Sequence, residues 1–117
     1  MSEPTVRVSQ YTICGYPNPD SINTHLYEIT VEERGLGRWA VCRMGRCCYD
    51  HNGIEEYEPN PSGRDDEWLE RFRFADVDEA IEVAKRVVPS IIINGRTAAQ
   101  CWAWEQNRAK ELEVVTP

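Results

Sequence analysis

Three cysteines and a histidine near the middle of the chain are the residues best suited to chemistry. Cys42, Cys47, Cys48 and His51 offer four side chains of the kinds that bind zinc, all within ten residues. Zinc ribbons, however, place two cysteines two to four residues apart and repeat that pair elsewhere in the chain. This sequence has one C-x4-C-C run and no second pair, so its spacing disfavours a zinc site.

The turn expected at residues 44–45 predicts how these cysteines face one another. A two-residue turn there places Cys42 directly opposite Cys47, whereas Cys48 points to the other face of the sheet. Opposed side chains come closest at a pair that makes no backbone hydrogen bonds, and a cross-strand disulfide fits there. We expect these cysteines to be packing residues, with a metal- or thiol-dependent activity centred on the Cys42/Cys47 hairpin as the alternative.

Other groups suited to catalysis are few. A nucleophile needs a base within hydrogen-bond reach and a third group to orient that base, and His25 and His51 are the only histidines. The sequence has no phosphate-binding glycine loop, no H-x-x-x-H metal motif and no G-x-S-x-G motif. We therefore predict that the protein is not an enzyme and uses no cofactor, and we assign no catalytic, cofactor-binding or metal-binding residue.

Acidic residues are concentrated in one segment. The chain carries a net charge of −7, and residues 50–82 hold twelve acidic residues against three arginines, which makes that segment −9 and the remainder +2. Such a field disfavours nucleic acid and anionic membranes as partners and favours a basic protein surface, although it also serves plain solubility. The candidate protein-binding carboxylates are those of Glu55, Glu56, Asp65, Asp66 and Glu67.

One tryptophan is a further candidate for binding. The chain has four tryptophans, which serve both as large core residues and as interface anchors. Trp104 departs from the apolar stripe that Ala98, Cys101 and Trp102 form on the same predicted helix. We therefore expect Trp104 to be exposed and to contact either a second copy of the chain, in a homodimer, or another partner.

A series of strands is expected to position the cysteines and the first acidic residues. Residues 26–33 alternate, with Tyr27, Ile29 and Val31 on one face, which is typical of a sheet with one buried side. Further strands are predicted at 5–14, 38–43, 46–50 and 54–58, and the Asn52-Gly53 pair predicts a hairpin between the last two. These strands form an antiparallel meander of about four to five strands, whose order the sequence leaves open.

Helices are expected to follow the meander. Apolar residues spaced three and four apart predict an amphipathic helix at 76–88, which Pro89 ends. Thr97 and Gln100 form a capping box at the start of a C-terminal helix at 97–113. A short helix at 64–71, capped by Ser62 with Asp65, and a short strand at 90–93 are also predicted. The fold class is therefore α+β, in a single domain spanning residues 1–117.

The ends and the cysteine count favour a cytoplasmic protein. The N-terminus shows no basic and apolar leader, and no apolar run approaches the roughly 20 residues of a membrane helix. The chain has five cysteines, and an odd number argues against a secreted disulfide scaffold. We expect reduced thiols and no membrane partner.

Several runs of this sequence resemble those of a group of phage proteins. They read WAV through YEP (39–59), PSGRDDEWL (61–69), RF (73–74) and NGRTA (94–98). With these runs the chain resembles, over about two thirds of its length, small accessory, non-structural proteins encoded by phages of actinobacteria. The resemblance carries no motif of known chemistry and implies no catalytic residues.

The resemblance implies a setting for the protein. It implies an accessory protein of the bacterial host's cytoplasm that binds and modulates a host protein, and proteins of this kind are in some cases toxic to the host. The host partner and its pathway are not identified by the sequence. A further alternative is an acidic DNA-mimic inhibitor, although the carboxylates are divided between a hairpin and two helices.

Overall fold

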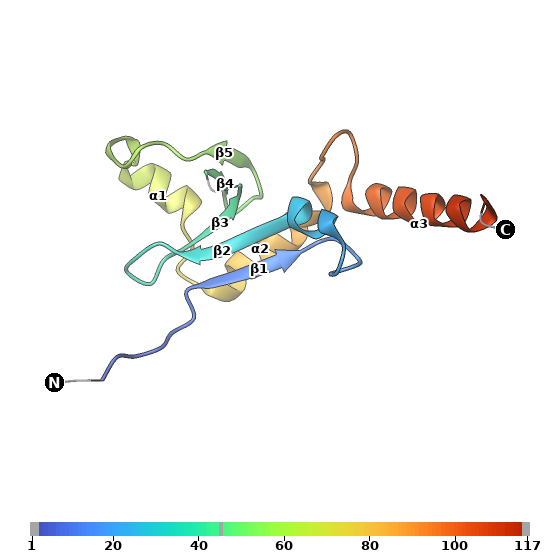
Figure 1. Cartoon of the computed structure of the whole chain (residues 1–117). Helices are drawn as coiled ribbons and strands as arrows, with labels where there is room; N and C mark the ends of the chain where they lie inside the picture. The colour runs from blue at the N-terminus through green and yellow to red at the C-terminus, as the bar shows by residue number, and fades with distance from the viewer. Residues whose placement is uncertain (1–2, 45, 116–117) are drawn as a thin grey trace.

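A five-stranded antiparallel sheet forms the centre of the computed structural model, which describes residues 3–44 and 46–115 (Figure 1). Its strands, in chain order, are β1 (Gln10–Cys14), β2 (Glu28–Glu33), β3 (Trp39–Arg43), β4 (Cys47–Tyr49) and β5 (Glu55–Tyr57). Each strand pairs with the next one along the chain, so the sheet order follows the sequence order. The predicted α+β class and the antiparallel meander are confirmed.

In the described residues, three α-helices and three short 3-10 helices accompany the sheet. The α-helices are α1 (Asp66–Phe72), α2 (Val77–Val87) and α3 (Ala98–Val115), and the 3-10 helices are η1 (Ile22–Tyr27), η2 (Pro61–Gly63) and η3 (Val88–Ser90). Figure 1 shows α3 and the N-terminal arm extending away from the sheet at opposite ends. The described chain is accordingly elongated, with extents of 65 × 38 × 23 Å.

The main core lies between one face of the sheet and α2. Because side chains alternate along a strand, Ile29, Val31 and Val41 project to the same side, where they are fully buried. The amphipathic face of α2 covers them with Ala80 and Ala84, which are also fully buried. The helix predicted at 76–88 is therefore confirmed. Asp76 is its N-cap and Val88 is its C-cap.

A second, smaller core lies on the opposite face of the sheet. Ala40, Cys42 and Cys48 project to that face and are fully buried beneath α1, where Phe72 is buried and Trp68 is partly buried. The rings of these two α1 residues stack with centroids 4.7 Å apart. The sheet is thus covered by α2 on one face and by α1 on part of the other.

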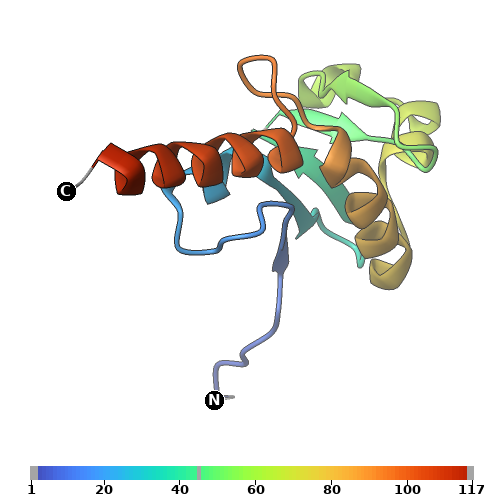
Figure 2. The ribbon, with the colours of Figure 1, turned by 90° about the vertical axis from the view of Figure 1, so that its right-hand side faces the viewer.

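The C-terminal helix begins at the predicted capping box. The backbone N–H of Thr97 donates to Oε1 of Gln100 at 2.9 Å, and the N–H of Gln100 donates to Oγ1 of Thr97 at 3.3 Å. Farther along α3, Glu105 accepts hydrogen bonds from the hydroxyls of Ser21 and Tyr16. These bonds attach α3 to the segment around η1, which passes beside the helix in Figure 2. Burial by the surrounding chain, with a further contribution from Glu105, raises the pKa of Tyr16 to about 12.

Two strand predictions are wrong at their ends. The strand expected at 5–14 begins only at Gln10, and the side chains of Val6 and Val8 are exposed. The strand expected at 26–33 begins at Glu28, because Ser21 caps the 3-10 helix η1 that runs through Tyr27. Local hydrogen bonding at the serine therefore overrides the alternation at that end of the strand.

Two further predictions are wrong in the second half of the chain. No strand forms at 90–93: η3 ends at Ser90, and Ile93 makes only an isolated bridge with Arg96. The short helix expected at 64–71 begins at Asp66, and Asp65 is its N-cap, with Oδ1 accepting from the N–H of Trp68 at 2.8 Å. Ser62, the predicted cap, lies instead in η2.

The cysteine hairpin has a different register from the predicted one. The described pairs are Arg43 with Cys47 and Cys42 with Cys48, so three residues rather than two connect β3 to β4. Met44 adopts a positive φ of 52° in this connection, while Gly45, the predicted turn glycine, lies outside the described residues. The expected Cys42/Cys47 pairing is therefore wrong.

The burial of the main core predicts a large effect of truncating β2. Ile29→Ala removes a fully buried side chain between β2 and α2. We expect the free energy of unfolding, measured by chemical denaturation, to fall by about 2–5 kcal/mol. Ile22→Ala is the matched control, because Ile22 is 89% exposed and should change stability by less than about 0.5 kcal/mol. Equal losses in the two variants would contradict this core.

Candidate functional site

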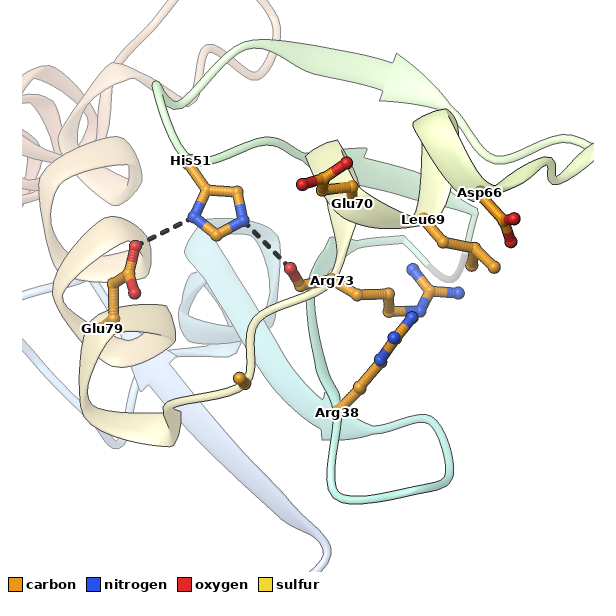
Figure 3. A pocket seen from close by; sticks show the side chains of 8 residues that line it. Arg38, His51, Asp66, Leu69, Glu70, Arg73 and Glu79 are labelled. Atoms are coloured by element: carbon orange, nitrogen blue, oxygen red, sulfur yellow. Dashed lines mark hydrogen bonds and ion pairs between the residues drawn. The ribbon is translucent and has the colours of Figure 1, made fainter.

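A hollow of about 430 Å³ opens between α1, the start of α2 and the turn that follows β4 (Figure 3). We call it the α1 hollow, and it is lined by Arg38, His51, Asp66, Leu69, Glu70, Arg73, Ala75 and Glu79. A second hollow, of about 280 Å³, lies beside it and is lined by Asp50, His51, Asn52, Glu67, Glu70 and Arg71. His51 and Glu70 line both hollows, so the two are adjacent.

The turn after β4 places His51 between the two hollows. The carboxylate of Asp50 accepts hydrogen bonds from the N–H groups of Asn52 and Ile54, both at 2.9 Å. Gly53 has a φ of +80°, a conformation that a residue with a side chain rarely adopts. The predicted Asn-Gly hairpin is confirmed, and it directs His51 toward α1 and α2.

Both ring nitrogens of His51 face oxygen acceptors. Its Nδ1 lies 2.9 Å from Oε1 of Glu79, and its Nε2 lies 3.0 Å from the carbonyl oxygen of Arg73 (Figure 3). The imidazolium form donates at both positions, whereas the neutral ring donates at only one. Burial alone would lower the pKa of His51, but Glu79 and the Arg73 carbonyl raise it above its ordinary value.

The outward side of α1 carries carboxylates that have no cation of their own. Among the described residues, Asp66, Glu67 and Glu70 make no side-chain hydrogen bond or ion pair, and all three are exposed. Asp78 of α2 is likewise exposed and without a side-chain partner among the described residues, whereas Glu82 pairs with Lys85 at 3.5 Å. Asp66, Glu67 and Glu70 are therefore the cation-free carboxylates that lie at the mouths of the two hollows.

A buried carboxylate lies beneath this surface. Glu58, which follows β5, is 2% exposed, and its Oε1 accepts from Nη2 of Arg73 at 2.5 Å. Its Oε2 lies 3.4 Å from Nη1 of Arg34, and Oε1 lies 3.7 Å from Nε of Arg64. Burial alone would raise the pKa of Glu58, but these three arginines hold it below its ordinary value. We call Glu58 and these arginines the Glu58 cluster.

The structure separates the five candidate carboxylates by role. Asp66 and Glu67 line the hollows, and Glu56 lies nearby through an ion pair of 3.3 Å with Arg71. Asp65 is occupied as the helix cap. Glu55 projects to the opposite face of β5, where it pairs with Arg43 at 2.8 Å.

Trp104 is not part of this site. It lies on α3, which Figure 1 shows at the opposite end of the molecule from α1. The residue is 43% exposed, as expected, and the guanidinium carbons of Arg96 and Arg108 lie 4.8 Å and 5.7 Å from the ring centroid. The tryptophan is therefore partly covered by two cations of its own chain.

The sequence did not identify the residues that hold the site together. Glu58 belongs to an acidic run in which nothing marks it as buried, and Arg73 lies in a segment that alternates like a strand. The contacts of His51 come from Arg73, which directly follows α1, and from Glu79 of α2. Both lie more than 20 residues away along the chain, and local pattern does not report such contacts. The Asn-Gly turn beside His51 was the one available signal.

We found neither a candidate metal site among the described residues nor a match to a known protein. Within residues 3–44 and 46–115, no group of three or more histidine, cysteine, aspartate or glutamate side chains is positioned to hold a metal ion. Comparisons with protein-family models, with curated proteins and with solved structures found no match.

Removing the charge of Glu58 tests the buried cluster. Glu58→Gln leaves the guanidinium of Arg73, 5% exposed, without its carboxylate. We expect the free energy of unfolding to fall by about 3–5 kcal/mol, because an unpaired buried charge remains. Glu55→Gln breaks a more exposed pair with Arg43 and should cost less than about 1 kcal/mol. Similar, small losses in both variants would show that the cluster is not a stabilising unit.

The raised pKa of His51 predicts a pH dependence of stability. Because the folded pKa is the higher one, the contribution of His51 is complete below the unfolded pKa of about 6.5 and is lost as pH rises through the folded pKa. We expect the stability difference between the native chain and His51→Gln to shrink as pH rises. Denaturation at a series of pH values measures it, and a difference that grows with pH would contradict the assignment.

Proposed function

We propose that this chain is a non-enzymatic binding protein that uses the outward side of α1 to bind a basic surface of another protein. In the setting implied by the sequence resemblance, that partner is a protein of the bacterial host's cytoplasm, which the chain modulates, to the detriment of the host in some cases. The observation that supports the proposal best is the set of exposed, cation-free carboxylates of Asp66, Glu67 and Glu70.

The chemistry of the α1 hollow favours an arginine or lysine side chain. The hollow combines carboxylates at its mouth with the half-buried side chain of Leu69. A long basic side chain lays its apolar stem on such a surface and places its charge among the carboxylates. Opposite charges across an interface also accelerate association.

Arg38 adds a second element of recognition to the hollow. It precedes β3, lines the hollow, is exposed, and makes no side-chain hydrogen bond or ion pair with the described residues. A partner that places a basic residue against α1 and a carboxylate against Arg38 would match both charges. This arrangement favours a folded protein surface over a uniformly charged polymer.

Nucleic acid and membranes fit the described chain less well. The exposed carboxylates of α1 repel phosphate groups, which supply most of the affinity of nucleic acid for proteins. No helix in the described part of the chain has both the length and the apolar character needed to cross a membrane.

A triple variant and a charge-matched control test the proposal. Asp66→Asn, Glu67→Gln and Glu70→Gln together remove the cation-free carboxylates of α1. The control replaces Asp78 and Glu82 of α2 and Glu111 of α3 by their amides. It therefore changes the net charge of the chain by the same amount as the triple variant, but away from α1. Capture of proteins from an actinobacterial lysate, followed by affinity measurement with the captured partner after purification, gives the readout.

We expect the triple variant to bind the partner more weakly by a factor on the order of ten or more, and the control to bind as the native chain does. Binding should also weaken as salt is raised, because exposed charges are screened. A partner retained equally by both variants would contradict binding at α1. A partner lost only on Trp104→Ala would also contradict it, and would indicate binding at α3 instead.

A further inference from the structure

Two cysteine sulfur atoms meet inside the smaller core. Cys42 of β3 and Cys48 of β4 are directly opposite each other in the sheet, and both side chains are fully buried. Their Sγ atoms lie 3.7 Å apart. The two thiols are therefore close enough to share a hydrogen bond, and a small movement brings them to bonding distance.

The backbone hydrogen bonds of β4 show which kind of strand pair the cysteines form. The N–H of Glu58 donates to the carbonyl of Arg46 at 2.7 Å, and the N–H of Asp50 donates to the carbonyl of Ile54 at 3.0 Å. Residues 46 and 50 thus direct their backbone groups toward β5. Because successive residues of a strand direct these groups alternately to its two neighbours, Cys48, two residues from each of them, also directs its groups toward β5. Cys42 and Cys48 are consequently a non-hydrogen-bonded pair, the kind with the shortest Cα separation.

The remaining cysteines do not compete for this bond. Cys47 projects to the opposite face of β4, near Glu55. Cys14 ends β1 and lies near the carbonyl of Tyr16, and Cys101 belongs to α3, where it accepts from the hydroxyl of Tyr16. Position therefore selects one pair among the five cysteines of the chain.

We propose that Cys42 and Cys48 are a thiol oxidation site that closes to an intramolecular, cross-strand disulfide when the protein meets a small disulfide oxidant such as glutathione disulfide. This proposal is independent of the binding function proposed for α1. One cysteine sulfur attacks the oxidant, its S–S bond breaks, and one glutathione leaves with the proton of the thiol. The second cysteine then attacks the mixed disulfide and releases the second glutathione, so two protein thiols are oxidised and one glutathione disulfide is reduced.

The surroundings of the pair favour this reaction once the oxidant has access. Nη2 of Arg34 lies 3.5 Å from Sγ of Cys42, and a guanidinium stabilises a neighbouring thiolate. The hydrogen bond from Cys42 lowers the pKa of Cys48, with the charges of Arg73 and Arg34 contributing in the same direction. The same hydrogen bond, together with burial, raises the pKa of Cys42, so the geometry fixes the disulfide that forms and not the order of attack.

Access requires movement of α1. Trp68 and Phe72 of this helix cover the pair, and α1 has only seven residues. So short a helix has little stability apart from its packing, and local opening exposes what it covers. Oxidation should therefore proceed at the rate set by α1 opening.

Peptide mapping of the full chain tests the pairing. The native protein is incubated at a series of ratios of glutathione disulfide to glutathione, quenched with acid, alkylated and digested with trypsin. Cleavage after Arg46 separates Cys42 from Cys47 and Cys48, so a disulfide appears as residues 39–43 linked to residues 47–64. We expect this linked pair in the native chain and in Cys47→Ser, and its loss in Cys48→Ser.

Trp68→Ala provides a second measurement that does not depend on the folding of the cysteine variants. We expect it to speed formation of the linked peptides by a factor on the order of ten, while Trp104→Ala on α3 leaves the rate unchanged. The proposal is overturned if the link persists in Cys48→Ser and disappears in Cys47→Ser. It is equally overturned if no link forms at the most oxidising ratio even in Trp68→Ala.

Discussion

The buried carboxylate of Glu58 is the constraint on which the rest of this structure depends. Moving a carboxylate out of water costs several kcal/mol unless opposite charges accompany it. Three arginines accompany this one, and they come from three places: Arg34 from the β2–β3 connection, Arg64 from before α1, and Arg73 from its C-terminal end. One side chain thereby joins the end of β5 to both ends of α1 and to the β2–β3 connection.

This constraint explains how a seven-residue helix has a defined position. The cap at Asp65 and the packing of Trp68 and Phe72 contribute, but Arg73 also places its guanidinium 5.2 Å from the centroid of the Trp68 ring, over the same core. The two sides of α1 then acquire different roles. Its outward side presents the exposed carboxylates, and its inward side covers the opposed thiols of Cys42 and Cys48.

The elements with a strong local pattern could be predicted from the sequence, and those set by distant contacts could not. Alternation identified β2, the apolar stripe identified α2, and the capping box at Thr97 identified the start of α3. The partner of Cys42 depends on the length of the β3–β4 connection. Two connecting residues would place Cys47 opposite Cys42, whereas the observed three place Cys48 there. The sequence named Asp66 and Glu67 among its candidate carboxylates, and both line the hollows. It did not distinguish the buried Glu58 from its exposed neighbours, because the three partners of Glu58 lie elsewhere along the chain.

Native-state hydrogen exchange of the Glu58→Gln protein tests most directly whether this cluster holds α1 in place. The amides of α1 should lose protection in Glu58→Gln and keep nearly all of it in Glu55→Gln, which breaks only the more exposed pair with Arg43. That result would show that the Glu58 cluster, and not the loss of a carboxylate in general, holds α1 in place. Unchanged protection of α1 in Glu58→Gln, or equal losses in the two variants, would contradict the central role of Glu58.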